Sequence, residues 1–321
     1  MPTSPKSNLP KVIIISGPTA SGKTEWSLQL AKKYNGEIIS ADSRQVYKKM
    51  TIGTAKTPGE WQWRANWKGL RHSYFVDNIP HHLIDIVDPG SRFTVAEFRD
   101  KAVKYIKLAY QNKTVPLVVG GTGLYIDALV QNLSIPRIAP NKKLRNSLEE
   151  KSKEELLQLL KTLDPTAAAT IDVHNPRRVI RALEVCILTG SEFSAQKKKG
   201  DSMFDFLHIG VSVPRDVLYD RINKRVDSMV QEGIVKEIEL LLKQKYSWDL
   251  PSMSGIGYRQ FKEFFEGKIS LDDAVQLLKR DTRRYARRQL TWFRRNKDIK
   301  WCETYEEVEA LVDAFLAEKK A

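Results

Sequence analysis

The apolar positions of this chain follow two patterns that alternate along the sequence. Runs of consecutive β-branched or apolar residues, beginning with Val12–Ile15, are typical of strands buried on both faces of a sheet. Similar runs occur at 38–39, 116–119 and 204–213. Between them lie segments such as 93–111, whose apolar residues have helical spacing. The alternation predicts an α/β fold built on a parallel sheet.

The strand pattern is interrupted between about residues 135 and 200, where helix boundary signals follow one another. Ser152 and Glu155 have the spacing of a capping box, and Gly190 is placed to end a helix. A strand pattern then returns, which predicts that these helices interrupt a single core. The predicted parts are a disordered lead-in at 1–10, a core at 11–134 and 204–321, and an all-helical insertion at 135–203.

The composition is that of a basic globular protein. Hydrophobic residues make up 41% of the 321 positions, and 53 Lys and Arg against 39 Asp and Glu give a net charge of +14. That charge favours a polyanionic partner. Two cysteines are too few for a disulfide framework or a four-ligand zinc site. No apolar run approaches the ~18 residues that a membrane span needs, so we expect a cytoplasmic protein that does not contact membranes.

The first strand pattern leads directly into a phosphate-binding motif. The sequence G-x-x-x-x-G-K-T stands between this strand and a helical pattern, which is the context that a P-loop requires. Lys23 would reach the outer phosphate oxygens, and the Thr24 hydroxyl would bind Mg²⁺. The residues expected to hold a diphosphate or a polyphosphate are Gly17, Pro18, Thr19, Ala20, Ser21, Gly22, Lys23 and Thr24.

Asp42 follows the second strand pattern. At the carboxyl end of a strand in an open α/β sheet, its carboxylate would face the P-loop cleft. An equally good interpretation from this stretch alone is a capping role, which Asp and Ser often have.

A second glycine turn, Gly120-Gly-Thr-Gly123, follows the strand pattern at 116–119. It would place further backbone groups at the same cleft. No Asp ends this strand, so the usual metal-holding carboxylate of a P-loop ATPase is missing, which weighs against ATP hydrolysis.

Three groups of arginines are candidates for binding anions. Arg221 and Arg225 are four residues apart, so one helix face would present both, although either could pair with Asp220 or Asp227. A second group lies in the first two turns of the helix after Pro176. These cations would contact a phosphate docked at that helix end, or else they are solvated. The third lies on the long predicted helix at 271–295, which carries eight cations against three acids. A nucleic-acid backbone is the natural counterpart of that helix.

Residues 59–80 contain Trp61, Trp63 and Trp67 among basic residues. These tryptophans could stack on bases, but a surface excursion packed by its own tryptophans is the better interpretation. The strand pattern that follows contains His81 and His82, which would point to opposite faces and cannot share a metal.

Seven motifs together resemble the tRNA dimethylallyltransferase family, of the bacterial type without a zinc-finger tail. They run in order from about residue 11 to 295 and are Gly17-Pro-Thr-Ala-Ser-Gly-Lys-Thr24, Asp42-Ser-Arg-Gln-Val-Tyr47, Ile52-Gly-Thr-Ala-Lys56, His82-Leu-Ile-Asp85, Gly120-Gly-Thr-Gly-Leu-Tyr125, Asn175-Pro-Arg-Arg-Val-Ile-Arg-Ala-Leu-Glu184 and Thr282-Arg-Arg-Tyr-Ala-Arg-Arg-Gln-Leu-Thr-Trp-Phe293. The stretch at 59–80 is longer than the family's usual connection.

The resemblance implies a P-loop kinase-like core with a helical insertion that grips the anticodon stem-loop. It implies transfer of a dimethylallyl group from dimethylallyl diphosphate to N6 of the adenosine immediately 3′ of the anticodon, with Mg²⁺. Asp42 would accept the proton, Thr122 would lie near the substrate channel, and Lys23, Thr24, Arg221 and Arg225 would neutralise the leaving diphosphate. We expect a monomer whose tRNA-binding residues are Asp42, Ser43, Arg44, Gln45, Thr122, Arg145, Arg177, Arg178, Arg181, Ser254, Gly257, Tyr258, Arg259, Arg284 and Arg288.

Three other functions remain open at this point. A small-molecule kinase also combines a P-loop with an Asp after the second strand, but it needs neither the basic helix nor the insertion. An isopentenyltransferase acting on free AMP would share the chemistry without gripping RNA. A non-catalytic RNA-binding protein with a relic P-loop is disfavoured by the intact Lys23, Thr24 and Asp42.

Overall fold

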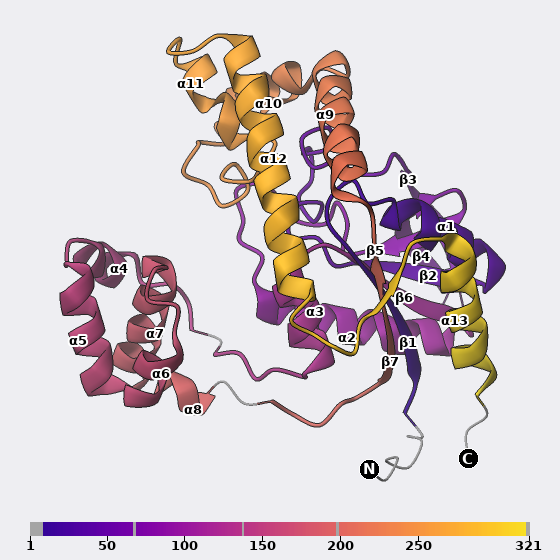
Figure 1. Ribbon diagram of the computed structural model, residues 1–321, viewed down its shortest axis with the longest axis horizontal. Coiled ribbons are helices and arrows are strands. Elements are labelled where there is room, and N and C mark those ends of the chain that lie inside the picture. The colour runs from indigo at the N-terminus through magenta and orange to yellow at the C-terminus, as the bar shows by residue number, and fades with distance from the viewer. Residues whose placement is uncertain (1–8, 67–68, 137, 197–198, 319–321) are drawn as a thin grey trace. The chain divides into compact units, whose positions relative to one another are not determined.

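The computed structural model describes residues 9–66, 69–136, 138–196 and 199–318 (Figure 1). The chain forms two compact units, one made of Met1–Ile126 with Met203–Ala321 and the other of Asp127–Ser202. The insertion predicted from the sequence pattern spans 135–203, whereas the helical unit begins eight residues earlier. The predicted lead-in at 1–10 falls largely outside the described residues.

The larger unit is built on a mostly parallel sheet, as predicted, with the strand order β3-β4-β5-β2-β6-β1-β7-β8. From β5 to β8 all neighbours are parallel. The strands are β1 (Lys11–Ser16), β2 (Gly36–Ser40), β3 (Glu60–Asn66), β4 (Gly69–Val76), β5 (Ile79–His82), β6 (Val115–Gly120), β7 (Asp205–Val211) and β8 (Lys300–Cys302). The carboxyl ends of β1, β2 and β6, which are neighbours, lie at one edge of the sheet and carry the three motifs predicted to form the site.

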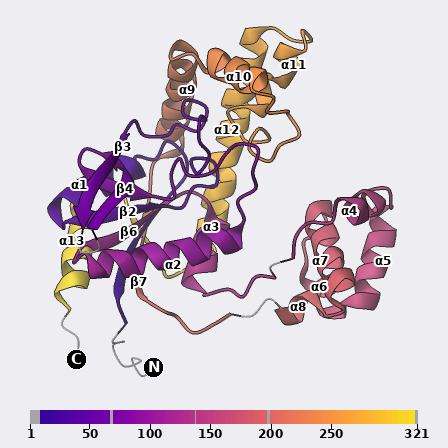
Figure 2. The ribbon, with the colours of Figure 1, turned by 180° about the vertical axis from the view of Figure 1, so that it is seen from behind.

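Helices cover both faces of this sheet. On one face α1 (Lys23–Lys33) and α13 (Tyr305–Ala317) bury alternate side chains of β1, β6 and β7, including Ile13, Leu117 and Ile209. On the other face α2 (Val95–Gln111) lies against β2 and β6, and α3 (Gly123–Val130) follows the second glycine turn (Figure 2). The Thr94 capping box predetermines where α2 begins. The fold therefore has the layered α/β arrangement that ligand-binding open sheets share.

The stretch at 59–80 is part of the sheet. β3 and β4 form an antiparallel hairpin that extends the parallel core beyond β5. The prediction of a surface excursion missed this pairing, because a strand at a sheet edge buries too few side chains to show a clear apolar pattern. Trp67 lies outside the described residues.

A second core lies beside the sheet in the same unit, where three helices pack on the segment that follows β2. They are α9 (Arg215–Gln231), α10 (Ile234–Lys243) and α12 (Leu271–Phe293), connected through the short η1 (Arg259–Phe261) and α11 (Lys262–Phe265). Their buried residues, among them Ile238 and Leu278, pack with Tyr47 and Met50. This packing places α9 and α12 beside the glycine turns.

The smaller unit is helical. It contains α4 (Lys142–Glu149), α5 (Lys153–Leu163), α6 (Pro165–Thr170), α7 (Pro176–Thr189) and α8 (Phe193–Gln196). Its core is formed by residues of α4, α5 and α7, including Leu148, Leu160 and Leu183. The capping box at Ser152 and the helix end at Gly190 are present as predicted. Within the described part of the chain, no helix has the length and apolarity needed to cross a membrane.

Candidate functional site

The P-loop connects β1 to α1 with the geometry of an anion-binding loop. Gly22, at the start of α1, has a φ of +95°, a conformation that favours glycine. A Cβ atom on Gly17 would lie only 2.9 Å from Oγ of Ser21. That hydroxyl is buried and is without a hydrogen-bond partner among the described residues. Because a buried unpaired hydroxyl is costly, a phosphate oxygen in the loop would satisfy it.

Lys23 turns back over the P-loop. Its Nζ donates to the backbone oxygen of Pro18 at 3.0 Å. Burial lowers the pKa of Lys23 to about 8, while the nearby Asp42 carboxylate opposes the shift and the Arg225 guanidinium adds to it. Lys23 is thus close enough to Asp42 and Arg225 for both groups to shift its pKa. A bound diphosphate would raise this pKa again, because its negative charge favours the protonated ammonium.

Two arginines of α9 reach the same loop. Nη1 of Arg221 donates to the backbone oxygen of Ser21, and Nη1 of Arg225 donates to Oγ1 of Thr19, each at 3.5 Å. The acids that could have captured them have other partners, since Asp220 pairs with Lys224 and Asp227 pairs with Lys279. The predicted clamp of two arginines therefore lies over the P-loop, and the alternative pairing is excluded.

Asp42 combines its two candidate roles. Its Oδ1 accepts hydrogen bonds from the backbone N–H groups of Arg44 at 2.8 Å and Gln45 at 3.3 Å, which is a capping arrangement. Its Oδ2 makes no hydrogen bond to the part of the chain that the structure describes. One oxygen fixes the turn, and the other stays without a hydrogen bond to the described residues.

The second glycine turn meets the turn that follows Asp42. Oγ1 of Thr122 accepts the backbone N–H of Ser43 at 3.0 Å, and the Thr122 backbone N–H donates to Ala41. Tyr285 of α12 lies close to Thr122 and Asp42; burial, with a smaller contribution from Asp42, raises the pKa of this phenol to about 12. Tyr285 therefore stays a neutral hydrogen-bonding group beside Asp42. Its part in the site was not predicted, because its spacing shows only an apolar helix side.

Gln289 of α12 joins the two glycine turns. Its Oε1 accepts the backbone N–H of Thr19 at 2.9 Å, and its Nε2 donates to the backbone oxygen of Gly121 at 2.8 Å. The contact needs glycine at 121, since a Cβ there would lie 2.2 Å from Nε2 of Gln289. Gln289 was not predicted as a site residue. It lies inside the motif at 282–293, where the arginines are the visible signal.

Two segments predicted to contact RNA lie together on this unit. The guanidinium of Arg44 donates to the backbone oxygen of Pro251, and its Cδ lies 3.1 Å from where a Cβ on Gly255 would be. In the same loop Ser254 and Arg259 are exposed, and Arg259 pairs with Asp281. Tyr258, by contrast, is 1% exposed.

The loop at 254–259 is fixed to the motif at 52–56 by close backbone packing and a shared carboxylate. Gly257 has a φ of +106°, and a Cβ there would lie 2.1 Å from the backbone oxygen of Gly53. Glu237 of α10 accepts the backbone N–H groups of residues 51–53 and the hydroxyl of Tyr258. Both Gly257 and Tyr258 therefore help to fix the conformation of this loop.

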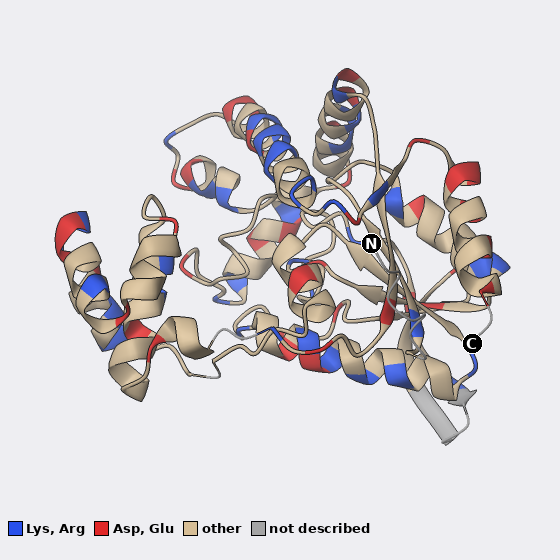
Figure 3. Ribbon diagram, turned by 60° about the horizontal axis from the view of Figure 1, so that its bottom comes forward, with Lys and Arg blue, Asp and Glu red and all other residues tan. Residues whose placement is uncertain are grey.

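Lys and Arg positions are frequent along α12 (Figure 3), and the ion pairs divide them into paired and unpaired groups. Lys279 pairs with Asp227, and Arg280 pairs with Asp281. Arg284 and Arg288 are exposed and form no ion pair with any described residue, although Arg288 lies over the ring of Tyr285. The unpaired arginines leave α12 with the positive surface that a polyanion requires.

In the helical unit, two arginines predicted to bind RNA hold a buried carboxylate. Glu184, which is 0% exposed, accepts two bonds from Arg145 at 2.8 and 2.6 Å and one from Arg181 at 2.6 Å. Arg181 also donates to the backbone oxygens of residues 136 and 138. Their hydrogen bonds, together with that from the Asn141 backbone, outweigh the effect of burial and lower the pKa of Glu184 to about 2. Glu184 belongs to the motif at 175–184, and its local sequence gives no sign of this role.

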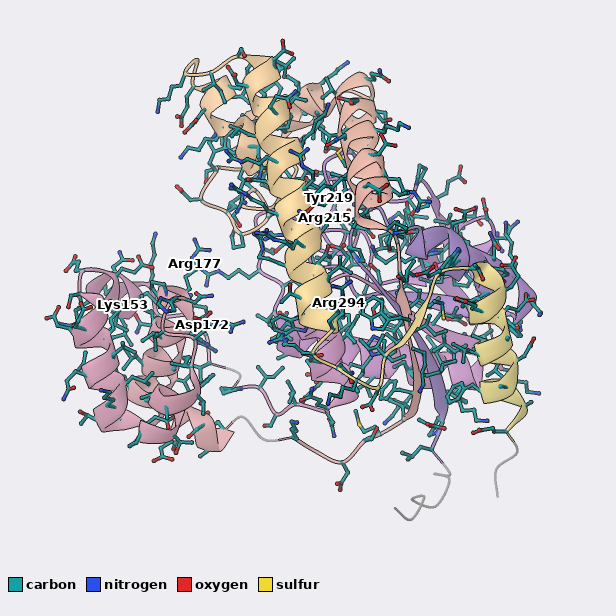
Figure 4. The ribbon with its side chains drawn as sticks, viewed as in Figure 1. Lys153, Asp172, Arg177, Arg215, Tyr219 and Arg294 are labelled. Carbon is teal, nitrogen blue, oxygen red and sulfur yellow. The ribbon has the colours of Figure 1, made fainter. Side chains whose placement is uncertain are left out.

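The remaining arginines of α7 are open to solvent. Arg177 and Arg178 are exposed in the first turn, and the side chain of Asn175 makes no capping bond. Figure 4 places Arg177 at the same end of the helical unit as Lys153 of α5. Lys153 lies 3.3 Å from Nδ1 of His174.

The residues present fit a magnesium ion held mainly by the substrate. Thr24 is exposed at the first turn of α1, and its hydroxyl bonds to no described residue. Across the described ranges, no group of three or more His, Cys, Asp or Glu side chains could hold a metal. Mg²⁺ commonly takes one or two protein oxygens with phosphate oxygens and waters, which matches this donor set.

The site has a P-loop on an α/β sheet, two arginines over this loop and a carboxylate oxygen without a hydrogen bond to the described residues. This combination is typical of an enzyme that transfers a group away from a diphosphate or a polyphosphate. The chain belongs to the IPP transferase family, whose model matches residues 45–296. A second model, described as isopentenyl transferase, matches residues 10–78.

Similar proteins carry names that agree with this membership. A tRNA dimethylallyltransferase of Acetivibrio thermocellus is 44% identical over 297 residues, covering 90% of both chains. One from a Roseiflexus species is 46% identical over 293 residues, covering 90% of this chain and 91% of the relative.

Two solved structures are also similar along nearly the whole chain. The tRNA isopentenylpyrophosphate transferase of Bacillus halodurans has a TM-score of 0.69 at 39% identity, covering 96% of this chain and 97% of its own. A eukaryotic dimethylallyltransferase described as acting on tRNA has a TM-score of 0.78 at 27% identity, covering 97% of this chain and 80% of its own. The predicted family and fold class are confirmed.

Proposed function

We propose that this enzyme transfers a dimethylallyl group from dimethylallyl diphosphate to N6 of the adenosine immediately 3′ of the anticodon in tRNA. The observation that carries the proposal is that Arg225 donates to Thr19 in the P-loop, while the Asp42 carboxylate is close enough to Lys23 of the same loop to act on its pKa. Family membership and the names of the relatives support the choice of substrates.

The diphosphate is the leaving group. The bond between C1 of the dimethylallyl group and the diphosphate oxygen breaks, and its electron pair leaves on that oxygen. Lys23, Arg221 and Arg225, with the free backbone N–H groups of the P-loop, stabilise the charge that develops there. Mg²⁺ bound through Thr24 would add a Lewis acid at the same oxygens.

The adenine amine is the nucleophile. N6 forms a bond to C1 and loses a proton to Oδ2 of Asp42, the oxygen that the turn does not use. Oδ1 keeps its bonds to the Arg44 and Gln45 backbone while this happens. Thr122, hydrogen-bonded to Ser43 and close to Tyr285, lines the same place. The adenine must leave its stack to reach these groups.

The RNA contacts follow from exposure and pairing. Arg177, Arg178, Arg284 and Arg288 are exposed cations with no acid partner in the described chain, and they are suited to phosphates. Ser43, Arg44 and Gln45, on the turn that follows Asp42, form a second set with Thr122, and Ser254 and Arg259 lie on the exposed loop that Arg44 contacts. For Arg145, Arg181, Gly257 and Tyr258 we propose an indirect contribution, because each is already engaged in holding its own segment. We propose that the protein acts in the cytoplasm as a monomer.

The test is transfer of label from radiolabelled dimethylallyl diphosphate to an anticodon stem-loop, with AMP and ATP as parallel acceptors. We expect label on the stem-loop alone and only when the target adenosine is present. Label on AMP would identify an enzyme of free nucleotides. If no acceptor is labelled and ATP is consumed, the protein is a kinase.

A further inference from the structure

Trp61, on the edge hairpin of β3 and β4, is bonded to a carboxylate beside the site. Its indole Nε1 donates to Oδ2 of Asp85 at 3.0 Å. The other oxygen of Asp85 accepts Nζ of Lys56 at 2.6 Å. The hairpin therefore contacts the Asp85 carboxylate of an ion pair with Lys56, whose side chain is 1% exposed.

This ion pair is part of the support of the turn that follows Asp42. Lys56 also donates to the backbone oxygen of Tyr47 at 2.6 Å, and the backbone N–H of Asp85 donates to the backbone oxygen of Gln45 at 2.9 Å. Gln45 in turn donates from Nε2 to the backbone oxygens of Thr54 and Ala55. Each contact leads from the pair to residues 45–47 or to the turn that carries Lys56.

Asp85 needs external support to hold this position. Its φ is +55°, a conformation that non-glycine residues seldom adopt and that persists only where the surroundings enforce it. With Oδ2 bonded to Trp61, the carboxylate cannot rotate away from Lys56. Without that bond Oδ2 faces solvent, since the Asp85 side chain is 22% exposed.

The indole is itself held in place by the hairpin. His72 of β4 lies between two tryptophan rings, 4.9 Å from that of Trp61 and 4.7 Å from that of Trp63. Tyr74 contacts Trp61 edge-on, and its hydroxyl donates to the backbone oxygen of Thr57. These contacts fix the direction of the Trp61 N–H.

We infer that Trp61 is a positioning residue for the adenosine-binding turn at 42–47, acting through Asp85 and Lys56. The inference rests on the proposed function, because it assigns the hairpin a task in the same transfer reaction. Trp61 is only 37% exposed, and its N–H is already committed to Asp85, whereas Trp63 is 67% exposed and lacks such a bond among the described residues. This difference makes Trp63 the matched control.

The experiment compares Trp61→Phe with Trp63→Phe in the full-length enzyme. Phenylalanine keeps a ring and removes only the N–H and part of the packing. A hydrogen bond to a charged group is worth enough that its loss should lower kcat on the anticodon stem-loop about 3- to 10-fold. The KM for dimethylallyl diphosphate and the Kd for the stem-loop should stay within about twofold, and Trp63→Phe should resemble the wild type in all three.

A double variant tests the route of the effect. In an Asp85→Asn background, Trp61→Phe should lower kcat by less than about twofold further, because residues that act through one contact are not additive. Full additivity would overturn the route through Asp85.

Three other results would overturn the inference. They are equal kcat values for the two tryptophan variants, weaker stem-loop binding by both with unchanged kcat, and a lower melting temperature of Trp61→Phe without a change in kcat. The second result would identify a base-stacking surface, and the third a purely stabilising contact. If the wild-type enzyme labels no stem-loop, the proposed function itself fails, so the two failures are distinguishable.

Discussion

The backbone N–H of Thr19 in the P-loop donates to Oε1 of Gln289, 2.9 Å away on helix α12. The same side chain donates to Gly121, so one buried amide holds the two glycine turns at a fixed separation. The helix that carries the exposed Arg284 and Arg288 thereby also holds the P-loop against the second glycine turn. A single amide links the elements that we propose bind the two substrates.

Replacing this amide should damage the diphosphate site specifically. Gln289→Met keeps the length of the side chain and leaves the Thr19 N–H and the Gly121 oxygen unpaired. Because such a loss costs about 1–3 kcal/mol, kcat/KM for dimethylallyl diphosphate should fall about 10- to 100-fold. Stem-loop affinity should change less than about twofold. Thr291→Ala, which removes a hydroxyl bonded only to the helix backbone, is the control, and wild-type kinetics for Gln289→Met would show that the bridge is dispensable.

The parts of the site that local sequence determines were predictable. The glycine motif and Asp42 lie at strand ends, and the four-residue spacing of Arg221 and Arg225 puts them on one helix face. Contacts between distant segments were not. Gln289 meets Thr19 across 270 positions of sequence, and nothing near Gln289 indicates that partner.

The contacts that the sequence patterns did not indicate have physical explanations as well. Arg145 and Arg181 are cations of the kind that bind RNA phosphates. In the structure both pair with Glu184, which lies one helical turn from Arg181. The three residues of β8 are too few to produce a pattern. In β3 the alternate side chains Trp61 and Trp63 lie on the exposed side of an edge strand. The apolar residues of this strand therefore face the surface, which is the reverse of the pattern that indicates a half-buried strand.

Acid should destabilise the helical unit through Glu184. Its pKa is lowered to about 2 in the folded protein, so the carboxylate contributes stability that is complete above its ordinary value of 4.5 and is lost as the pH falls toward 2. Glu184→Gln should remove this pH dependence. It should also lower the free energy of unfolding by about 2–3 kcal/mol, the lower end for a broken buried pair, because both arginines are partly solvated. Urea unfolding followed by hydrogen exchange in residues 127–202 measures both effects. Glu150→Gln, an exposed carboxylate of the same unit, should change neither, and equal behaviour of the two variants would contradict the account.

The unpaired arginines of α12 should govern the salt dependence of RNA binding. Arg284→Ala combined with Arg288→Ala should reduce the slope of log Kd against log salt by roughly 1–2, since each phosphate contact contributes about one counterion. Lys224→Ala with Lys243→Ala removes the same charge from cations that already pair with Asp220 and Glu239. This control should leave the slope unchanged. An identical slope for both double variants would remove α12 from the RNA interface.

The most direct test of the proposed mechanism is the single-turnover rate of prenyl transfer by Asp42→Asn. Asparagine retains an oxygen for the Arg44 and Gln45 backbone N–H groups, so the turn persists while the proton acceptor is lost. General base catalysis contributes about 10²- to 10⁴-fold, and we expect the rate to fall by that amount with the stem-loop Kd unchanged. A wild-type transfer rate in Asp42→Asn would contradict the role of Asp42 as the base that accepts the adenine proton.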